Sequence, residues 1–268
     1  MLRFENIIVD ARDIRAAADF WRQALGWVVT FDDGEEICIN PGGGDPNDAA
    51  TWPFPDIAFE PVDDPDAHRQ RVHLDLASTS VEEQQATVER LLALGATPAD
   101  VGQPDDAPFT VLADPEGNAF CVLDPRDEYQ GTGSLAAIVV AAQDAGALRD
   151  FYVAATGWDL VRDEPGYVSF RDPRGTGPFL ELITREGLDR ADDRKNRTHL
   201  DVSPRQDEDQ ANYVNQLVAL GARRVDVGQG PRVTWVVLAD PEGNELCVLS
   251  PRPYRRRSRV RGRGEGPG

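Results

Sequence analysis

The sequence predicts an α+β fold of two tandem domains, each made of two βαβββ modules. Three observations carry this prediction. The octet VLADPEGN occurs twice, at 111–118 and 237–244. His199, Gly221 and Asp240 each lie 126 positions after a matching residue of the first half, so the halves are an ungapped duplication over that span. Within each half, apolar runs and amphipathic stretches follow the order strand, helix, strand, strand, strand, and they do so twice.

The first module opens with a predicted strand at 4–11. Asp13 is a typical N-cap for the helix that follows, which carries apolar residues at helical spacing and ends at Gly26. Its three further strands are expected at 27–31, 36–40 and 56–61.

The other three modules repeat this plan. The second module has predicted strands at 73–76, 98–101, 109–112 and 119–123, with a helix at 81–94. The third has strands at 135–141, 158–162, 167–172 and 178–183, with a helix at 145–156. The fourth has strands at 199–202, 224–227, 234–238 and 245–249, with a helix at 207–220. The predicted domains are therefore 1–126 and 134–252, joined by a linker at 127–133 and followed by a disordered Arg-rich tail at 253–268.

Each octet reads as a tight hairpin. Its Asp-Pro pair starts a turn, and the Gly117-Asn118 pair of the first copy can supply positive φ before the next apolar run. The outgoing strand then places Cys121 at a fixed distance from the turn. Cys247 is its counterpart in the second copy.

Composition narrows the class of protein. A formal net charge of -19 repels phosphate backbones, so we expect no nucleic-acid partner for the folded body. No apolar run reaches the length of a membrane span, and no cleavable signal precedes the first strand, which favours a cytoplasmic protein that does not contact membranes. The three cysteines are expected to be reduced thiols. The tail is either a solvated segment or one that contacts an acidic surface.

The repeated motifs resemble those of the vicinal oxygen chelate superfamily of glyoxalases, bleomycin-resistance proteins and dioxygenases. The resemblance rests on an FW or FY helix that ends in a Gly-Trp pair, an HLD strand followed by a helix ending in LGA, and the DPEGN turn. It covers nearly the whole chain apart from the tail, and the glyoxalase-like branch is the nearest in pattern. It implies curved mixed sheets that enclose a cleft in each domain, where many members hold a divalent metal ion.

The family's four cleft positions can be carried over onto this sequence. In the first half they fall on Asn6, Ala58, His73 and Cys121. In the second half they fall on Ala137, Glu181, His199 and Cys247. Both cysteines stand where the family has Glu, and alanine has no ligand atom. The resemblance therefore implies a degenerate metal site of His199, Glu181 and Cys247, with zinc, manganese, iron or nickel as candidate ions and a metal-free site as the alternative.

These residues suggest roles that each have a structural alternative. Glu181 and Cys247 are the candidate catalytic residues, and His73, Cys121 and Asn6 are candidate ligand-binding residues. A histidine on a half-buried strand is often a hydrogen-bonded core residue, and a cysteine often packs inertly. Asp75 and Asp201 lie two residues beyond the histidines, hence on the same strand face, where they could orient the rings. Two tryptophans near predicted loop or strand ends, Trp52 and Trp235, are candidate walls for a flat organic ligand.

Two classes of function follow from the sequence. The first is a small-molecule enzyme of the lyase, isomerase or dioxygenase type with a degenerate metal site. The alternative is a metal-free protein that sequesters a drug-like compound. A third interpretation is that one domain supports the other as a scaffold. The domains are expected to pair within the chain, with a dimer of two chains as the alternative.

Overall fold

The structure is a computed structural model that describes residues 2–43, 55–188 and 194–251. Over these residues it confirms the α+β fold of four βαβββ modules. The strands form two open, mixed, eight-stranded sheets. No helix in the described ranges has the length and apolar content of a membrane span. The predicted tail lies outside the described residues.

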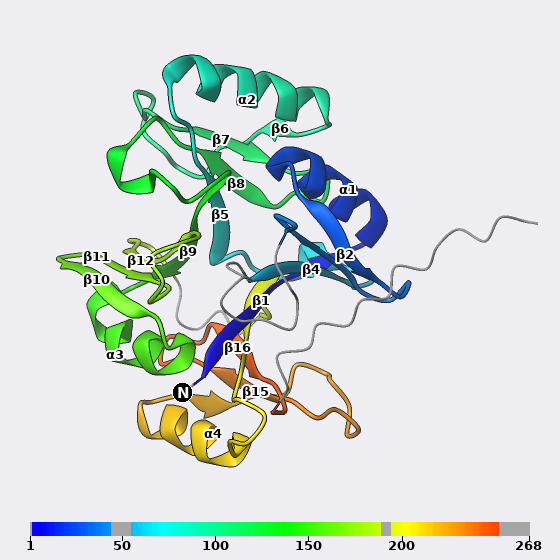
Figure 1. Ribbon diagram of the computed structural model, residues 1–268, viewed down its shortest axis with the longest axis vertical. Helices are drawn as coiled ribbons and strands as arrows, with labels where there is room; N and C mark the ends of the chain where they lie inside the picture. Colours follow the sequence, from blue (N-terminus) through cyan, green and yellow to red (C-terminus); the bar gives the residue numbers. More distant parts are fainter. Residues whose placement is uncertain (1, 44–54, 189–193, 252–268) are drawn as a thin grey trace, which may run out of the picture.

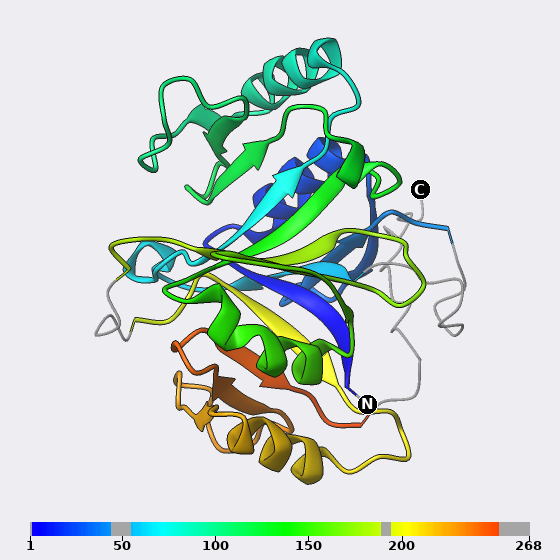
Figure 2. The ribbon, with the colours of Figure 1, turned by 90° about the vertical axis from the view of Figure 1, so that its left-hand side faces the viewer.

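Each sheet takes one module from each half of the chain. The first sheet has the order β14-β15-β16-β13-β1-β4-β3-β2. Its strands are β1 (Arg3–Ala11), β2 (Val28–Asp32), β3 (Ile37–Asn40), β4 (Asp56–Pro61), β13 (Thr198–Ser203), β14 (Arg223–Arg224), β15 (Val236–Ala239) and β16 (Glu245–Val248). We call it the β1/β13 sheet, because these two antiparallel strands join the modules, with Ile8 opposite His199. Figure 2 shows β1 in dark blue beside β13 in yellow.

The second sheet has the order β10-β11-β12-β9-β5-β8-β7-β6. Its strands are β5 (Val72–Leu76), β6 (Thr97–Pro98), β7 (Thr110–Ala113), β8 (Ala119–Val122), β9 (Leu135–Ala142), β10 (Asp159–Glu164), β11 (Tyr167–Arg171) and β12 (Phe179–Thr184). We call it the β5/β9 sheet after its central antiparallel pair, in which His73 lies opposite Val139. The modules of one half therefore belong to different sheets.

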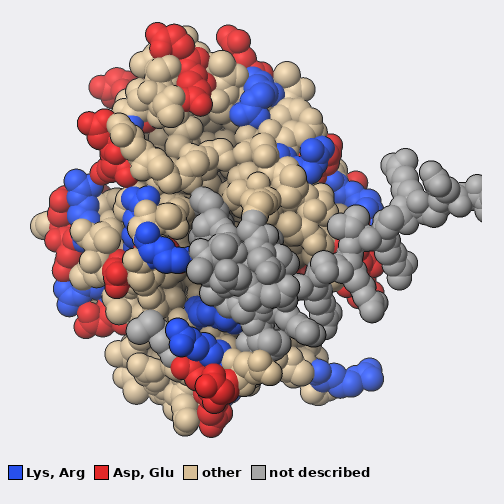
Figure 3. All heavy atoms as spheres, viewed as in Figure 1, with Lys and Arg blue, Asp and Glu red and all other residues tan. Residues whose placement is uncertain are grey.

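Within the described ranges, four α-helices surround these sheets, with α2 and α4 at opposite ends in Figure 1. Their bounds are α1 (Ile14–Leu25), α2 (Val81–Ala93), α3 (Ala145–Thr156) and α4 (Gln210–Ala219), and two short 3-10 helices are η1 (Pro65–Ala67) and η2 (Asp127–Tyr129). Asp13 caps α1 as expected, since its side chain accepts from the backbone N–H groups of Arg15 and Ala16. Gly26 ends α1 with φ 70°. On the face shown in Figure 3, acidic side chains gather at the upper end, where α2 lies.

Two predicted strands are much shorter than expected. The observed strands β6 and β14 have two residues each, so the segments 98–101 and 224–227 contribute one residue each, Pro98 and Arg224. In the first segment, the side chain of Asp100 accepts from Gly102 N, and that of Gln103 accepts from Val101 N, so local side-chain contacts replace sheet pairing. The same pattern recurs after β14, where Asp226 accepts from Gly228 N. The fourth helix also begins later than predicted, after the N-cap Asp209.

The repeated DPEGN turn forms hydrogen bonds within itself and also to the neighbouring module. Asp114 is buried and accepts from the backbone N–H groups of Glu116 and Asn118 at 3.0 and 2.8 Å, while Gly117 has φ 84°. The other oxygen of Asp114 accepts from Trp21 Nε1 at 2.9 Å. Each carboxylate oxygen of Glu116 accepts from a backbone N–H, of residue 12 or 13, at the start of α1. The turn therefore docks the second module onto the helix of the first.

The second copy docks in the same way. Asp240 accepts from the Tyr152 hydroxyl at 3.1 Å, and Glu242 accepts from the backbone N–H groups of residues 143 and 144 before α3. Arginines of the opposite half also reach these turns, because Arg71 donates to the carbonyl of Glu242 and Arg197 donates to that of Glu116. One main apolar core contains residues from all four modules, so it also packs the two halves against each other.

Candidate functional site

The β5/β9 sheet brings the first histidine and cysteine together on one face. Because side chains alternate along a strand, His73 and Asp75 project from the same face of β5. Asp75 lies opposite Cys121 on β8. On the other side, His73 lies opposite Val139 on β9, and Val139 lies opposite Glu181 on β12. Glu181 thus shares a sheet face with His73.

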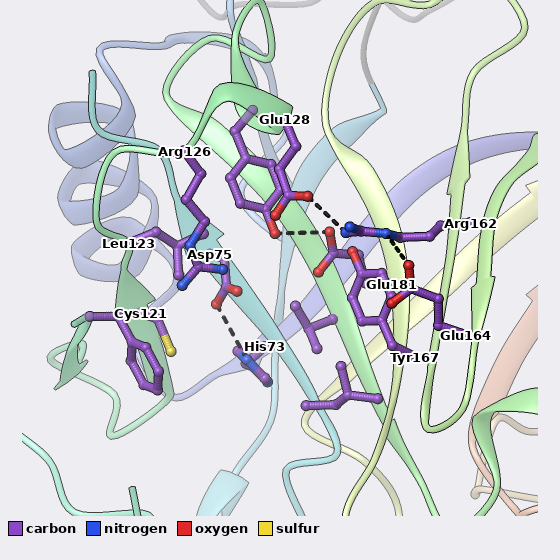
Figure 4. A pocket seen from close by; sticks show the side chains of 14 residues that line it. His73, Asp75, Cys121, Leu123, Arg126, Glu128, Arg162, Glu164, Tyr167 and Glu181 are labelled. Atoms are coloured by element: carbon purple, nitrogen blue, oxygen red, sulfur yellow. Dashed lines mark hydrogen bonds and ion pairs between the residues drawn. The ribbon is translucent and has the colours of Figure 1, made fainter. Parts of the chain in front are cut away.

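These residues line a pocket of about 380 Å³, which is at the small end of the range for ligand sites. Figure 4 shows its polar side chains in two groups, one around His73, Asp75 and Cys121 and the other around Glu181. Between and around them lie apolar and aromatic walls, formed by Phe109, Leu123, Tyr129, Val139, Tyr167 and Ile183. The pocket combines a polar floor with apolar walls, as small-molecule sites usually do.

Two tyrosines hold Glu181 in the pocket wall. The hydroxyl of Tyr129 donates to Glu181 Oε1 at 3.0 Å, and the hydroxyl of Tyr167 also hydrogen bonds to this carboxylate. Only 3% of Glu181 is exposed, and burial raises its pKa to about 7, although both phenol contacts act in the opposite direction. Burial and the nearby Glu181 raise the pKa of each tyrosine, so both stay protonated donors at neutral pH. Glu181 can therefore accept or release a proton near neutrality.

The cysteine of the first group is not a ready nucleophile. Burial, followed by the negative charge of Asp75, raises the pKa of the Cys121 thiol. The thiol is therefore protonated at neutral pH unless a cation displaces its proton. His73 Nε2 lies 3.3 Å from Asp75 Oδ1, yet this oxygen has no hydrogen-bond partner among the described residues. The two side chains are therefore in close contact without a hydrogen bond between these atoms.

The first group fits a divalent metal ion. One donor atom from each of His73, Asp75 and Cys121 lies within 4.8 Å of the other two. The buried Asp75 oxygen without a hydrogen bond is an acceptor that a cation would satisfy. A nitrogen, an oxygen and a sulfur ligand together suit zinc or a similar transition metal better than magnesium or calcium. Binding would release the thiol proton, and metal affinity would therefore rise with pH.

The β1/β13 sheet carries a second, more enclosed group. Donor atoms of His199, Asp201 and Cys247 also lie within 4.8 Å of one another. Burial lowers the pKa of His199 to about 3, with Lys195 adding to the effect, so its ring is neutral. Burial raises the pKa of Cys247 well above its usual range. At the strand position that matches Glu181, this sheet has Ala58, opposite Ile8.

The structure does not bring together the three residues of the metal site inferred from the sequence. His199 and Cys247 come together in the β1/β13 sheet, whereas Glu181 lies in the β5/β9 sheet with His73 and Cys121. The cause is the order of the strands in the sheet. The last strand of the third module, β12, pairs with β9, and β9 pairs with β5 of the second module and not with a strand of the fourth. The proposed catalytic pair of Glu181 and Cys247 is separated for the same reason.

The remaining candidates fall in three places. Asn6 lies opposite Asp201 at the junction of β1 and β13. Trp235 lies immediately before β15 and is 38% exposed. Trp52 lies outside the described residues.

Sequence reasoning missed Tyr129 and Tyr167 altogether. Tyr129 stands in the linker, where no repeat or periodicity marks it, and Tyr167 was read only as part of a strand.

Comparison with known proteins now identifies the family. A sequence profile described as a glyoxalase-like domain matches residues 6–123 and again 137–249. The chain belongs to this family. As a glyoxalase-like protein with two tandem regions, it falls within the vicinal oxygen chelate superfamily, as its motifs predicted.

Solved structures agree with this assignment at the level of fold. Glyoxalase I from Zea mays superimposes on this glyoxalase-like protein with a TM-score of 0.62 at 15% identity, covering 93% of this chain and 92% of that one. A Bacillus subtilis subsp. subtilis str. 168 protein, provisionally assigned as a dioxygenase, gives a TM-score of 0.55 at 13% identity, covering 94% and 86%. A search of curated proteins found no match. Identities this low show the shared fold alone.

Proposed function

We propose that this protein binds a small organic molecule in the β5/β9 pocket, next to a divalent metal ion held by His73, Asp75 and Cys121, and that it catalyses proton transfer there. The observation that carries the proposal is the position of Glu181. It is a buried carboxyl with a pKa of about 7 in the wall of the pocket that also contains the three metal-ligand candidates.

Each residue has a distinct task in this proposal. The metal would supply a positive charge that polarises a substrate oxygen. Glu181 takes the proton from the carbon beside that oxygen, since a base is most effective when its pKa lies near the working pH. Tyr129 and Tyr167 keep the carboxylate in place through their hydroxyls. The apolar walls exclude water and hold the body of the ligand.

The alternative is a metal-free binding protein without catalysis. The raised pKa of Cys121 favours it, because a neutral thiol beside Asp75 is stable without any cation. The two proposals differ in whether Cys121 loses its proton. The cytoplasmic location and the absence of a nucleic-acid partner also stay predictions.

Cobalt(II) loading distinguishes the two. A cobalt–thiolate bond gives a charge-transfer absorption, which we expect in the wild type and in Cys247→Ser but not in Cys121→Ser. Elemental analysis of the same samples gives the number of ions bound per chain. Absence of the band from wild-type protein at saturating cobalt would leave the metal-free proposal. A band that disappears only in Cys247→Ser would assign the metal to the β1/β13 sheet instead.

A further inference from the structure

The linker between the halves forms one wall of the β5/β9 pocket. Its 3-10 helix η2 carries Glu128 and Tyr129, and both hydrogen bond to residues of the third module. Tyr129 donates to Glu181, and its ring lies 5.8 Å from that of Phe179 in an edge-to-face arrangement. Glu128 Oε2 accepts from Arg162 Nη1 at 2.8 Å. These contacts give the pocket a defined wall whose charges can be counted.

Both arginines that line the pocket are already neutralised. Arg126 donates through Nη2 and Nε to Asp124 Oδ1, at 2.7 and 3.0 Å. Arg162 donates to Glu128 at 2.8 Å and to Glu164 at 2.9 Å. Neither guanidinium is therefore available as an unpaired cation to pair with a carboxylate or phosphate of a ligand.

Two other carboxylates of the pocket have no such partner. Among the described lining residues, Asp75 and Glu181 form no ion pair with a lysine or arginine. Glu181 accepts from two tyrosine hydroxyls, and a carboxylate has more acceptor sites than these two donors occupy. Arg162 is shared by Glu128 and Glu164, so this wall of the pocket also keeps a net negative charge. The pocket is short of positive charge and has spare acceptor capacity.

The geometry points to a cationic ligand. We propose that the β5/β9 pocket recognises the protonated amine of a compact, mainly apolar molecule through Glu181, and that it rejects carboxylates and phosphates of the same size. This inference rests on the proposed function, because it concerns the ligand of the same pocket. Selection against anions follows because burying a second negative charge next to Glu181 is unfavourable. The pocket volume of about 380 Å³ limits the ligand to roughly a single ring with a short chain.

Three ligands of equal shape test the proposal on the full chain. Tyramine carries an ammonium group, 4-hydroxyphenylacetamide is neutral, and 4-hydroxyphenylacetate is anionic. Isothermal titration calorimetry, without metal and with saturating zinc, gives the dissociation constant of each. We expect tyramine to bind at least about tenfold more tightly than the acetate, with the amide between them. Equal or tighter binding of the acetate, or no binding of tyramine at about 10 mM, overturns the proposal.

Two variants test the residue. Glu181→Gln removes the charge and keeps the shape, and should reduce the preference for tyramine to less than about threefold. Asp163→Asn is the matched control, since Asp163 lies between two lining residues of β10 but pairs with Arg149 on the opposite face. It should leave the preference unchanged. A preference that survives in Glu181→Gln overturns the assignment to Glu181.

The wild-type comparison needs no variant, so the proposal stays testable if Glu181→Gln fails to fold. Its failure is also distinguishable from that of the proposed function. If cobalt binds through Cys121 but the three ligands bind equally well, the inference about ligand charge is wrong and the proposed function still stands.

Discussion

The buried carboxyl of Glu181 should make the stability of the protein fall as pH rises. Burial raises its pKa from 4.5 to about 7 in the folded state, whereas in the unfolded chain it titrates near its ordinary value. Between these two pH values the unfolded state has lost the proton that the folded state still holds. The folded state therefore binds more protons in this window, and the free energy of unfolding decreases with increasing pH.

The magnitude follows from the shift. About 2.5 pKa units at 1.36 kcal/mol each amount to about 3 kcal/mol, which is present below pH 4.5 and lost once the pH has risen through about 7. Glu181→Gln keeps a polar side chain of the same shape but has no proton to lose. Its stability relative to wild type should therefore increase by about 3 kcal/mol between roughly pH 4 and pH 8.

Urea denaturation of chelator-treated protein at a series of pH values measures this difference. All other titrating groups are common to both proteins and largely cancel, provided that their mutual interactions are unchanged. Asp163→Asn is again the control, and its exposed surface position should give a difference within about 0.5 kcal/mol at every pH. A flat difference for Glu181→Gln, or one that favours the wild type as pH rises, would refute the account of Glu181 as a desolvated carboxyl.

Three further predictions concern the docking turns, the second histidine and the crossing of modules. Tyr152→Phe should lower the free energy of unfolding by about 1–3 kcal/mol in urea with an unchanged m value, because Asp240 loses a donor; an unchanged stability would contradict the docking role. The ring protons of His199 should show no NMR titration between about pH 5 and 8, since its pKa is about 3; a midpoint in that range would show a solvated ring. Residues 1–126 expressed alone should form a dimer in light-scattering experiments, because β1 and β5 each lose a partner strand, and a stable monomer would contradict this.

Much of the fold was predictable because its signals are local. The four modules follow from the duplicated octet and from helix ends such as Asp13 and Gly26, whose capping roles are confirmed. The predicted lengths of the strands at 98–101 and 224–227 were wrong because short side chains there accept hydrogen bonds from nearby backbone N–H groups. These local bonds compete with sheet pairing, and the pattern of apolar residues does not reveal them.

The site was only half predictable. That His73 and Cys121 could share a face follows from strand alternation and the repeat, and both line the pocket. Which module pairs with which depends on contacts between β1 and β13 and between β5 and β9, far apart in sequence and equally compatible with the pattern. For this reason Glu181 was assigned to His199, and the linker residue Tyr129 was not considered at all.

The exchange of modules between the halves has a consequence for how the two sheets can differ. If identical halves assembled as separate chains with this topology, both sheets would carry the same residues, and any substitution would appear in both. A single polypeptide removes that constraint, so one sheet can have Glu181 where the other has Ala58. Joining the halves in one chain thus allows the residues of one sheet's site to change independently of the matching residues in the other sheet.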